Sequence, residues 1–272
     1  MIDLPFDGSA FQTGAGCIAV CQQREPEFIL QQAISFGIDQ IVQRDSLAFE
    51  KEIKTSQIMI KEPRKFFEAP LCTILNPMEI SKEREKQHTS ISATCSSREQ
   101  RNTVIAQFAG KMSGQINDGL LSDVKLIVSE LASNAVLHAA SPEAGLLGQS
   151  DNKTTPPTDR ALLRPSHLKL GHDEERLVIC CRDDYGALDV TGLLERIRKC
   201  FAYGLAPMMN FGKGGAGVGT YMLFRAALSL YVAVNEGRQT MICVTLPMRG
   251  GQRQRESMSK NLHIFKGKPE SM

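Results

Sequence analysis

Hydrophobic residues recur at helical spacing along residues 119–139, the most regular stretch of the chain. The apolar positions lie three and four residues apart, at Leu120, Leu121, Val124, Ile127, Leu131 and Ala135. This period places them on one side of a helix, so it predicts an amphipathic helix. By contrast, residues 177–181 are continuously apolar, a pattern typical of a buried strand.

The same reasoning predicts a series of helices and strands over residues 86–248, interpreted as the main domain. Two overlapping capping boxes, Ser96 with Glu99 and Ser97 with Gln100, indicate where its first helix begins. Residues 140–166 are rich in Ser, Pro, Thr and Gly, which predicts a long flexible insertion. The other predicted elements are a strand at 88–94, helices ending near 113 and at 191–201 and 220–230, and hairpins at 168–182 and 231–246.

Residues 1–62 predict a small α/β piece. Its expected elements are strands at 18–20 and 38–42 and helices at 26–36 and 46–60, with Gly37 as a helix stop. This order resembles the last half of a response-regulator receiver domain, without the strand that carries the phospho-acceptor aspartate. The piece is therefore interpreted as a receiver remnant or an unrelated docking piece.

Two further regions predict little regular structure. Residues 63–85 are charged and contain prolines, which predicts a linker with one β-prone stretch at 66–75. Residues 249–272 are polar and basic, and predict a solvated tail.

Composition narrows the class of protein. The 272 residues are 42% hydrophobic and 23% charged, as in ordinary globular proteins. A net charge of +2 and a pI near 8.1 do not suggest direct binding to nucleic acid. No signal peptide or membrane-spanning run is apparent, so a cytoplasmic location is expected. None of the eight cysteines forms a C-x-x-C pair, and they are expected to be free thiols.

The first candidate chemistry lies on the helix predicted at 119–139. Glu130, Asn134 and His138 are four residues apart and share one edge of it. A carboxylate and an amide on adjacent turns can hold Mg²⁺ and a water near a phosphate, and the carboxylate can accept a proton. His138 is interpreted as a helix-end residue that interacts with the helix dipole.

The second signal follows the buried strand, where Asp183 and Asp184 precede Tyr185 and a turn glycine, Gly186. A carboxylate at the end of such a strand can accept the N–H of an adenine amino group.

The third signal is the glycine-rich stretch 212–221, which leads into a predicted helix. Its free backbone N–H groups and the helix N-terminus suit a phosphate. A Walker P-loop is excluded, because Gly212-Lys213 is not followed by Ser or Thr at the required place. A Rossmann fingerprint is disfavoured, because the stretch does not follow a first strand.

The order of these three signals resembles the histidine-kinase-type ATPase superfamily, over roughly residues 86–248. Glu130 and Asn134 match its N box, the residues 183–186 its first glycine box, and the residues 215–219 its second. Within the superfamily the chain looks most like the anti-sigma-factor serine kinases, from the 127–138 helix, Arg182-Asp183 and the final hairpin. The resemblance implies a two-layer α/β sandwich of the Bergerat fold, with a mostly antiparallel sheet.

The resemblance also implies roles for individual residues. Asn134 would bind Mg²⁺, and Glu130 would be a candidate base. Adenine would be read by Asp183 or Asp184, with Gly186 and Thr240 nearby, and Asp183 is preferred for its preceding Arg. The phosphates would lie against Lys213, Gly215, Gly217, Val218 and Gly219 under a lid at 189–213. Leu188 replaces the second glycine of the family's first box, which changes the expected motion of the lid.

Three functions are expected from these residues. The first is a regulatory protein-serine kinase that uses ATP and Mg²⁺ and binds a protein partner, a sigma factor or an antagonist-like protein. The second is a non-catalytic ATP-binding interaction module. The third is a histidine-kinase output domain, for which His88 is the only histidine upstream of the ATPase core. The oligomeric state is open, with a homodimer among the options.

Overall fold

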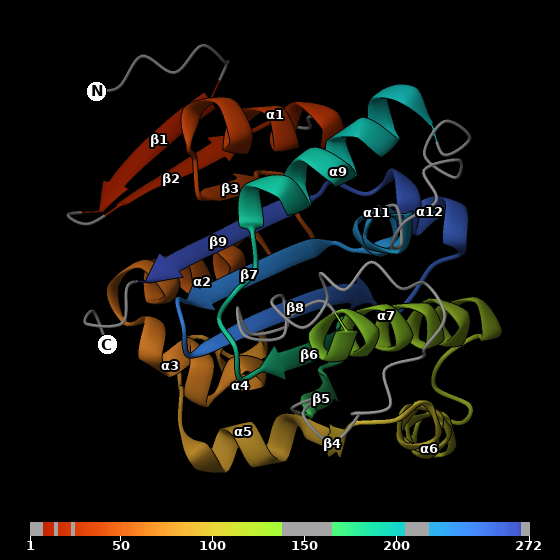
Figure 1. Cartoon of the computed structure of the whole chain (residues 1–272). Coiled ribbons are helices and arrows are strands. Elements are labelled where there is room, and N and C mark those ends of the chain that lie inside the picture. Colours follow the sequence, from red (N-terminus) through yellow and green to blue (C-terminus); the bar gives the residue numbers. More distant parts are fainter. Residues whose placement is uncertain (1–7, 14–15, 23–24, 138–164, 205–217, 268–272) are drawn as a thin grey trace, which may run out of the picture.

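The structure is a computed structural model that describes residues 8–13, 16–22, 25–137, 165–204 and 218–267. Most of the insertion predicted at 140–166 lies outside these residues, as does the glycine-rich stretch up to residue 217. The described residues form an α/β protein built on one mixed sheet (Figure 1).

The sheet has nine strands among the described residues, in the order β1-β2-β3-β9-β7-β8-β6-β5-β4. The strands are β1 Gly8–Thr13, β2 Gly16–Cys21, β3 Gln40–Gln43, β4 Thr89–Cys95, β5 Ser166–His172, β6 Arg176–Asp183, β7 Ser229–Asn235, β8 Gln239–Pro247 and β9 Asn261–Gly267. Neighbours are antiparallel except for β2 with β3 and β7 with β9. The prediction of a mostly antiparallel sheet is therefore confirmed.

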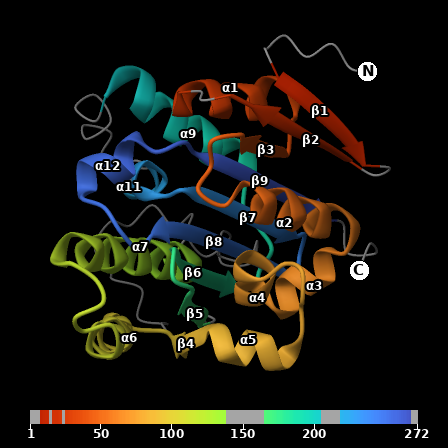
Figure 2. The ribbon, with the colours of Figure 1, turned by 180° about the vertical axis from the view of Figure 1, so that it is seen from behind.

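Helices cover both faces of the sheet (Figures 1 and 2). One face, here called the α7 face, carries α1 Pro26–Phe36, α6 Arg98–Lys111, α7 Asp118–Leu137, α9 Val190–Tyr203 and α11 Val218–Ala226. The other, the α4 face, carries α2 Phe49–Lys61, α3 Pro63–Glu68, α4 Pro70–Leu75 and α5 Lys82–His88. A short helix, α12 Gln252–Ser257, lies beside α11. Over residues 86–248 the helices α6, α7, α9 and α11 lie on one face, as the two-layer prediction expects, and residues 49–88 add a third layer on the other face.

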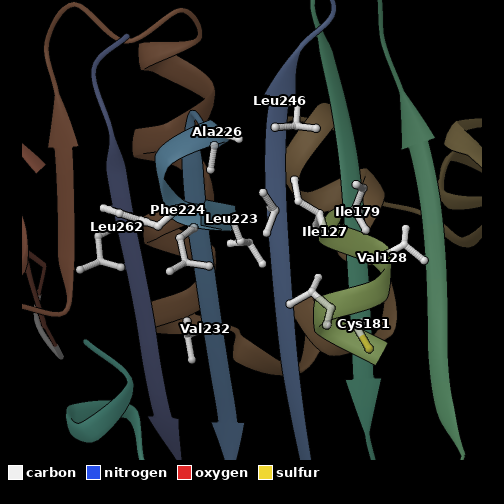
Figure 3. Packing of buried hydrophobic residues seen from close by; sticks show 14 of the residues in the cluster. Ile127, Val128, Ile179, Cys181, Leu223, Phe224, Ala226, Val232, Leu246 and Leu262 are labelled. Carbon is white, nitrogen blue, oxygen red and sulfur yellow. The ribbon is translucent and has the colours of Figure 1, made fainter. Parts of the chain in front are cut away.

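The larger core lies between the sheet and the helices of the α7 face. Ile127 and Val128 of α7 are fully buried against the strand that carries Ile179 and Cys181 (Figure 3). Burying such a side chain contributes roughly 1.5–3 kcal/mol to stability. The period of apolar residues along α7 is thus explained by burial of one side, and the predicted helix is confirmed.

A second core lies on the α4 face and explains the continuous apolar run of β6. Val178 and Cys180 point to this side, whereas Ile179 and Cys181 point to the α7 face. The partners on the α4 side are aromatic and aliphatic residues of the short helices, with Phe66, Phe67, Leu71, Ile74 and Leu75 among them. Strand β6 is therefore buried on both faces.

The prediction of a linker at 63–85 is wrong. The β-prone stretch at 66–75 forms α3 and α4, and Ser81 caps α5 by accepting a hydrogen bond from the Arg84 N–H. Pro63 and Pro70 each occupy the first turn of a helix, where proline is favoured because its missing N–H is not needed. The aromatic residues that suggest a strand are buried against the sheet as helix residues instead.

The prediction of a solvated tail at 249–272 is also wrong for its described part, which forms α12 and β9. Arg255 is buried and donates two hydrogen bonds to Asp123 Oδ2 in α7, at 2.9 and 2.7 Å. Lys260 is buried as well, and its Nζ donates to the carbonyl oxygens of Ala227 and Arg255. Asp123 and Ala227, both distant in sequence, thus hold the basic residues that suggest solvation.

Strand β9 joins the N-terminal piece to the rest of the sheet, since it pairs with β3 on one side and β7 on the other. Behind it lies a buried polar cluster centred on Glu52 of α2. Its carboxylate accepts hydrogen bonds from Arg176, Ser229 and Tyr231, and lies 2.9 Å from His263 Nε2. This cluster connects α2, β6, β7 and β9.

Other predicted elements agree with the structure. The helix at 26–36 and its stop at Gly37 are confirmed, as are both hairpins. Of the two capping boxes, Ser97 with Gln100 is the one that forms. All eight cysteines are free. In the described part of the chain, no helix combines the length and apolar character needed to cross a membrane.

Candidate functional site

Asp183 and Thr240 lie opposite each other at the end of β6 and the start of β8. Alternation along β6 places Asp183 on the same face as Ile179 and Cys181, the α7 face. Alternation along β8 places Thr240 on that face as well, in step with Val244. The two polar side chains are therefore neighbours beneath the helices, at the edge of the apolar core.

The Asp183 carboxylate is held by the backbone around it. Its Oδ1 accepts hydrogen bonds from the N–H groups of Tyr185, Gly186 and Thr240, at 3.0, 3.3 and 3.2 Å. Burial raises the pKa of Asp183, and these N–H groups partly oppose the rise. One carboxylate oxygen, Oδ1, is thus fixed by the protein backbone.

Thr240 adds a second polar atom at the same place. Its Oγ1 is buried and has no well-formed hydrogen bond within the described residues, although it is close enough to Asp183 to lower the pKa of that carboxyl. Buried hydroxyl groups are usually paired, because an unpaired one costs free energy. A ring with an amino group next to a ring nitrogen could satisfy both Asp183 and Thr240.

Gly186 fixes the turn that follows β6. Its φ of 64° lies in the left-handed region, and a Cβ there would come within 2.7 Å of Arg238 N. Its carbonyl oxygen accepts a 3.2 Å hydrogen bond from the Gly237 N–H. A glycine is required at this position, because the turn packs directly on the β7–β8 hairpin.

The structure separates the two candidate aspartates. Asp184 Oδ2 lies 3.0 Å from His167 Nε2, and its Oδ1 lies 3.3 Å from Arg182 Nε. His167 and Arg182 alternate onto the α4 face. Asp184 is therefore turned toward the side of the sheet opposite Thr240, and the geometry favours Asp183 as the carboxylate of the site.

Glu130 and Asn134 are brought together on α7, as predicted. Asn134 Nδ2 donates a 3.0 Å hydrogen bond to Glu130 Oε1, and both side chains are half-buried. The amide oxygen of Asn134 remains as an acceptor. The C-terminal end of α7 lies toward the arrowhead of β6, which ends at Asp183 (Figure 1).

Glu130 also meets the beginning of α11. Any Cβ at Gly219 would overlap the Glu130 carboxylate, so only glycine allows this approach. The start of α11 has the partial positive charge of a helix N-terminus, which favours an anion. Val218 and Gly219 are its first two residues, whereas Lys213, Gly215 and Gly217 lie outside the described residues.

Arg101 is a residue of this region that the sequence did not reveal. It belongs to α6, and its NH1 donates to the backbone oxygen of Ser129 at 3.3 Å and to the hydroxyl of Ser133. These residues each precede a site residue of α7, so Arg101 fixes that part of the helix against α6. No local spacing predicts such a contact, because it joins two helices.

The first part of the predicted lid at 189–213 is α9. Asp189 caps this helix by accepting a hydrogen bond from the Gly192 N–H, and its apolar side is buried, with Leu193, Leu194 and Ile197 at its centre. It packs against α1 and α11. Residues beyond 204 lie outside the described part of the chain.

The residues of the α7 face provide oxygen ligands for a hard cation. Within the described ranges no group of three or more His, Cys, Asp or Glu could hold a metal by itself. A Mg²⁺ ion held by Asn134 would therefore need further oxygens from the ligand and water, as Mg²⁺ in nucleotide sites usually does. No protein-family model and no curated protein matches this chain.

Proposed function

We propose that this chain binds ATP with Mg²⁺ on the α7 face, in a site of the histidine-kinase-type (Bergerat) ATPase kind. The observation that carries the proposal is the Asp183–Thr240 pair, a buried carboxylate held through Oδ1 beside a buried hydroxyl that lacks a well-formed hydrogen bond among the described residues. Asp183 would accept the N–H of the adenine amino group, and Thr240 would donate to a ring nitrogen.

The phosphate end of the site is supported by Glu130, Asn134 and the start of α11. The carboxylate lies against Gly219, where the phosphates would approach. Without a cation, the negative charges of Glu130 and the phosphates repel each other, so ATP binding is expected to require Mg²⁺. The ion would neutralise phosphate charge, held by the Asn134 amide oxygen, with Glu130 beside it as the candidate base.

We further propose that the bound ATP serves a regulatory protein-serine kinase of the anti-sigma-factor type. In that reaction the partner's serine hydroxyl oxygen bonds to the γ-phosphorus, the bond from that phosphorus to the β–γ bridging oxygen breaks, and ADP leaves. Glu130 accepts the hydroxyl proton. The partner would be a sigma factor or an antagonist-like protein, bound in the cytoplasm.

One observation favours the second candidate, a non-catalytic ATP-binding module. Leu188, which stands where the resembled family has a glycine, is packed against the apolar core. This contact anchors the segment between Gly186 and α9. A bound nucleotide would then stabilise one fixed surface, to which a protein partner could bind. The histidine-kinase alternative is weaker, because His88 ends the seven-residue helix α5 instead of lying on a long dimerising helix.

Calorimetry with ATP, with and without Mg²⁺, tests the site on wild type, Asn134→Ala and Asp183→Asn. The proposal expects Mg²⁺-dependent binding that both variants weaken. Wild-type protein that is folded but binds no ATP would overturn it. Transfer of labelled γ-phosphate to a partner serine, lost in Glu130→Ala with ATP binding retained, separates the kinase from the non-catalytic module.

A further inference from the structure

An open cavity of about 820 Å³ lies on the α4 face, on the other side of the sheet from Asp183 and Thr240. Strands β4, β5, β6 and β8, the β7–β8 hairpin and α3 surround it. The side chains that matter for its chemistry are Phe67, Lys169, Arg182, Asn235, Arg238 and Met241. Its volume is within the range of sites that bind small molecules.

The cavity lies beside two short helices of the α4 face, α3 and α4. Both α3 and α4 are six residues long, and they cover the centre of the sheet. Strand alternation then leaves Lys169 of β5 and Arg182 of β6 on the same face, beyond the helices. Phe67 and Met241 are buried at its apolar side.

The lining is rich in cations. Four Lys and Arg side chains border the cavity, with Glu68 as its one carboxylate among the described residues. Lys169 pairs with Glu85 at 2.6 Å, and Arg64 with Glu68 at 2.7 Å. Arg238 is exposed at the mouth, and its guanidinium has no hydrogen bond or ion pair within the described ranges.

Two residues that line the cavity each carry a buried polar atom without a hydrogen bond from the described protein atoms. One is the donor Arg182 Nε, which lies 3.3 Å from Asp184 Oδ1 but lacks the alignment of a hydrogen bond. The other is the acceptor Asn235 Oδ1. The Arg182 side chain as a whole is 36% exposed, so part of it is open to a ligand in the cavity.

We propose that this cavity is a second ligand site, for a small molecule that carries an oxyanion (carboxylate, phosphate or sulfonate) and an apolar part. The oxyanion lies between Arg182 and Arg238, and the apolar part packs against Phe67 and Met241. The site does not depend on the proposed ATP site, because none of these side chains belongs to the α7 face.

The test uses the full chain and the dye 8-anilinonaphthalene-1-sulfonate, an aromatic sulfonate of the proposed chemistry, followed by fluorescence. Saturable binding of one dye per chain is expected. Arg238→Ala should weaken it at least tenfold, because the unpaired cation is lost. Ser92→Trp, on the exposed edge strand β4, should abolish it by filling the cavity with a residue that strands tolerate.

Two matched control variants should keep an affinity for the dye within about twofold of wild type. Arg253→Ala removes an exposed arginine of α12, outside the cavity, and Asn134→Ala changes only the α7 face. Circular dichroism confirms that each variant is folded. The proposal would be overturned if the dye showed no saturable binding, or if both cavity variants kept the wild-type affinity for the dye. Displacement of the dye by ATP with Mg²⁺ would also overturn it. A chain that binds the dye but no ATP would overturn the proposed function alone.

Discussion

Asp183 Oδ1 accepts a 3.2 Å hydrogen bond from the Thr240 backbone N–H, across the junction of β6 and β8. The donor is a backbone N–H of the sheet, so the orientation of the carboxylate does not depend on the rotamer of a partner side chain. The Thr240 hydroxyl, in contrast, has no well-formed hydrogen bond among the described residues. The pair combines one position fixed by the fold with one group left for a ligand.

We expect Asp183→Asn to reduce the affinity for ATP roughly tenfold to a hundredfold, the range for a lost charge-assisted hydrogen bond. The amide oxygen can still accept the three backbone N–H groups, so the turn should survive. The control is Asp184→Asn, the neighbouring carboxylate directed to the α4 face. Calorimetry that shows the larger loss for the Asp184 variant would reverse the assignment of the two residues.

Thr240→Val should weaken ATP binding without lowering the stability of the fold. Since the buried hydroxyl lacks a well-formed hydrogen bond in the described structure, its removal should leave the free energy of unfolding within about 1 kcal/mol of wild type or raise it. ATP affinity should fall roughly threefold to tenfold. Thr245→Val is the matched control, because Thr245 also lies in β8 with an unpaired buried hydroxyl but faces the α4 side. Equal affinities for the two variants would count against the site.

Gly219→Ala should destabilise the protein by about 0.5–1.5 kcal/mol, because the added methyl forces the flexible end of the Glu130 side chain out of its preferred position. Combining it with Glu130→Ala should restore much of the lost stability. Urea unfolding of wild type, the two single variants and the double variant measures this coupling. Gly110→Ala in α6 is the control, because nothing lies within 4 Å of its added methyl. That change should stabilise by up to about 1 kcal/mol. Additive effects at positions 219 and 130 would show that the two residues do not touch.

The buried cluster around Glu52 predicts a dependence of stability on pH. Burial opposes the charge of Glu52, but bonding to His263, Arg176 and Tyr231 lowers its pKa from 4.5 to about 2. The lowered pKa stabilises the fold fully above pH 4.5, and this contribution, about 3 kcal/mol, is lost as pH falls toward 2. Unfolding of wild type between pH 6 and 2 should show the loss.

Glu52→Gln should remove that pH dependence and destabilise the protein by about 3–5 kcal/mol at pH 7, because the buried Arg176 loses its partner. Glu50→Gln, on the exposed side of α2, should behave as wild type. A Glu52 variant that keeps the wild-type slope below pH 4.5 would place the titrating group elsewhere.

Truncation after Met248 should prevent the chain from reaching its native structure. The deletion removes β9 and α12, and leaves the partners of Arg255 and Lys260 unpaired. Truncation after Gly267 keeps every described element and serves as the control. Circular dichroism and thermal unfolding would compare the two, and a cooperative wild-type transition in the shorter chain would contradict the expected role of β9.

Local patterns were sufficient to predict much of the fold. The apolar period of α7, the turn residues of both hairpins and the glycine stop of α1 act within a few residues. The same kind of reasoning fails for α3 and α4, where aromatic residues suggest a strand. Their prolines and their burial against β6 decide for helix.

The candidate site shows the same division. Glu130 and Asn134 share a helix, so their spacing predicts their contact. The sequence favours Asp183 over Asp184 through its preceding Arg but leaves both open, because the choice depends on where β6 ends and how the turn packs on the β7–β8 hairpin. The contact of Glu130 with Gly219 and the role of Arg101 depend on helix packing, which no short motif encodes.

The position of β9 has a consequence for how the protein is made. β9 is the last of the nine described strands to leave the ribosome, yet it lies between β3 and β7 in the middle of the sheet. Until it is synthesised, β3 and β7 each present an open edge, which is a template for aggregation. We therefore expect nascent chains to stay dependent on chaperones until β9 has been synthesised.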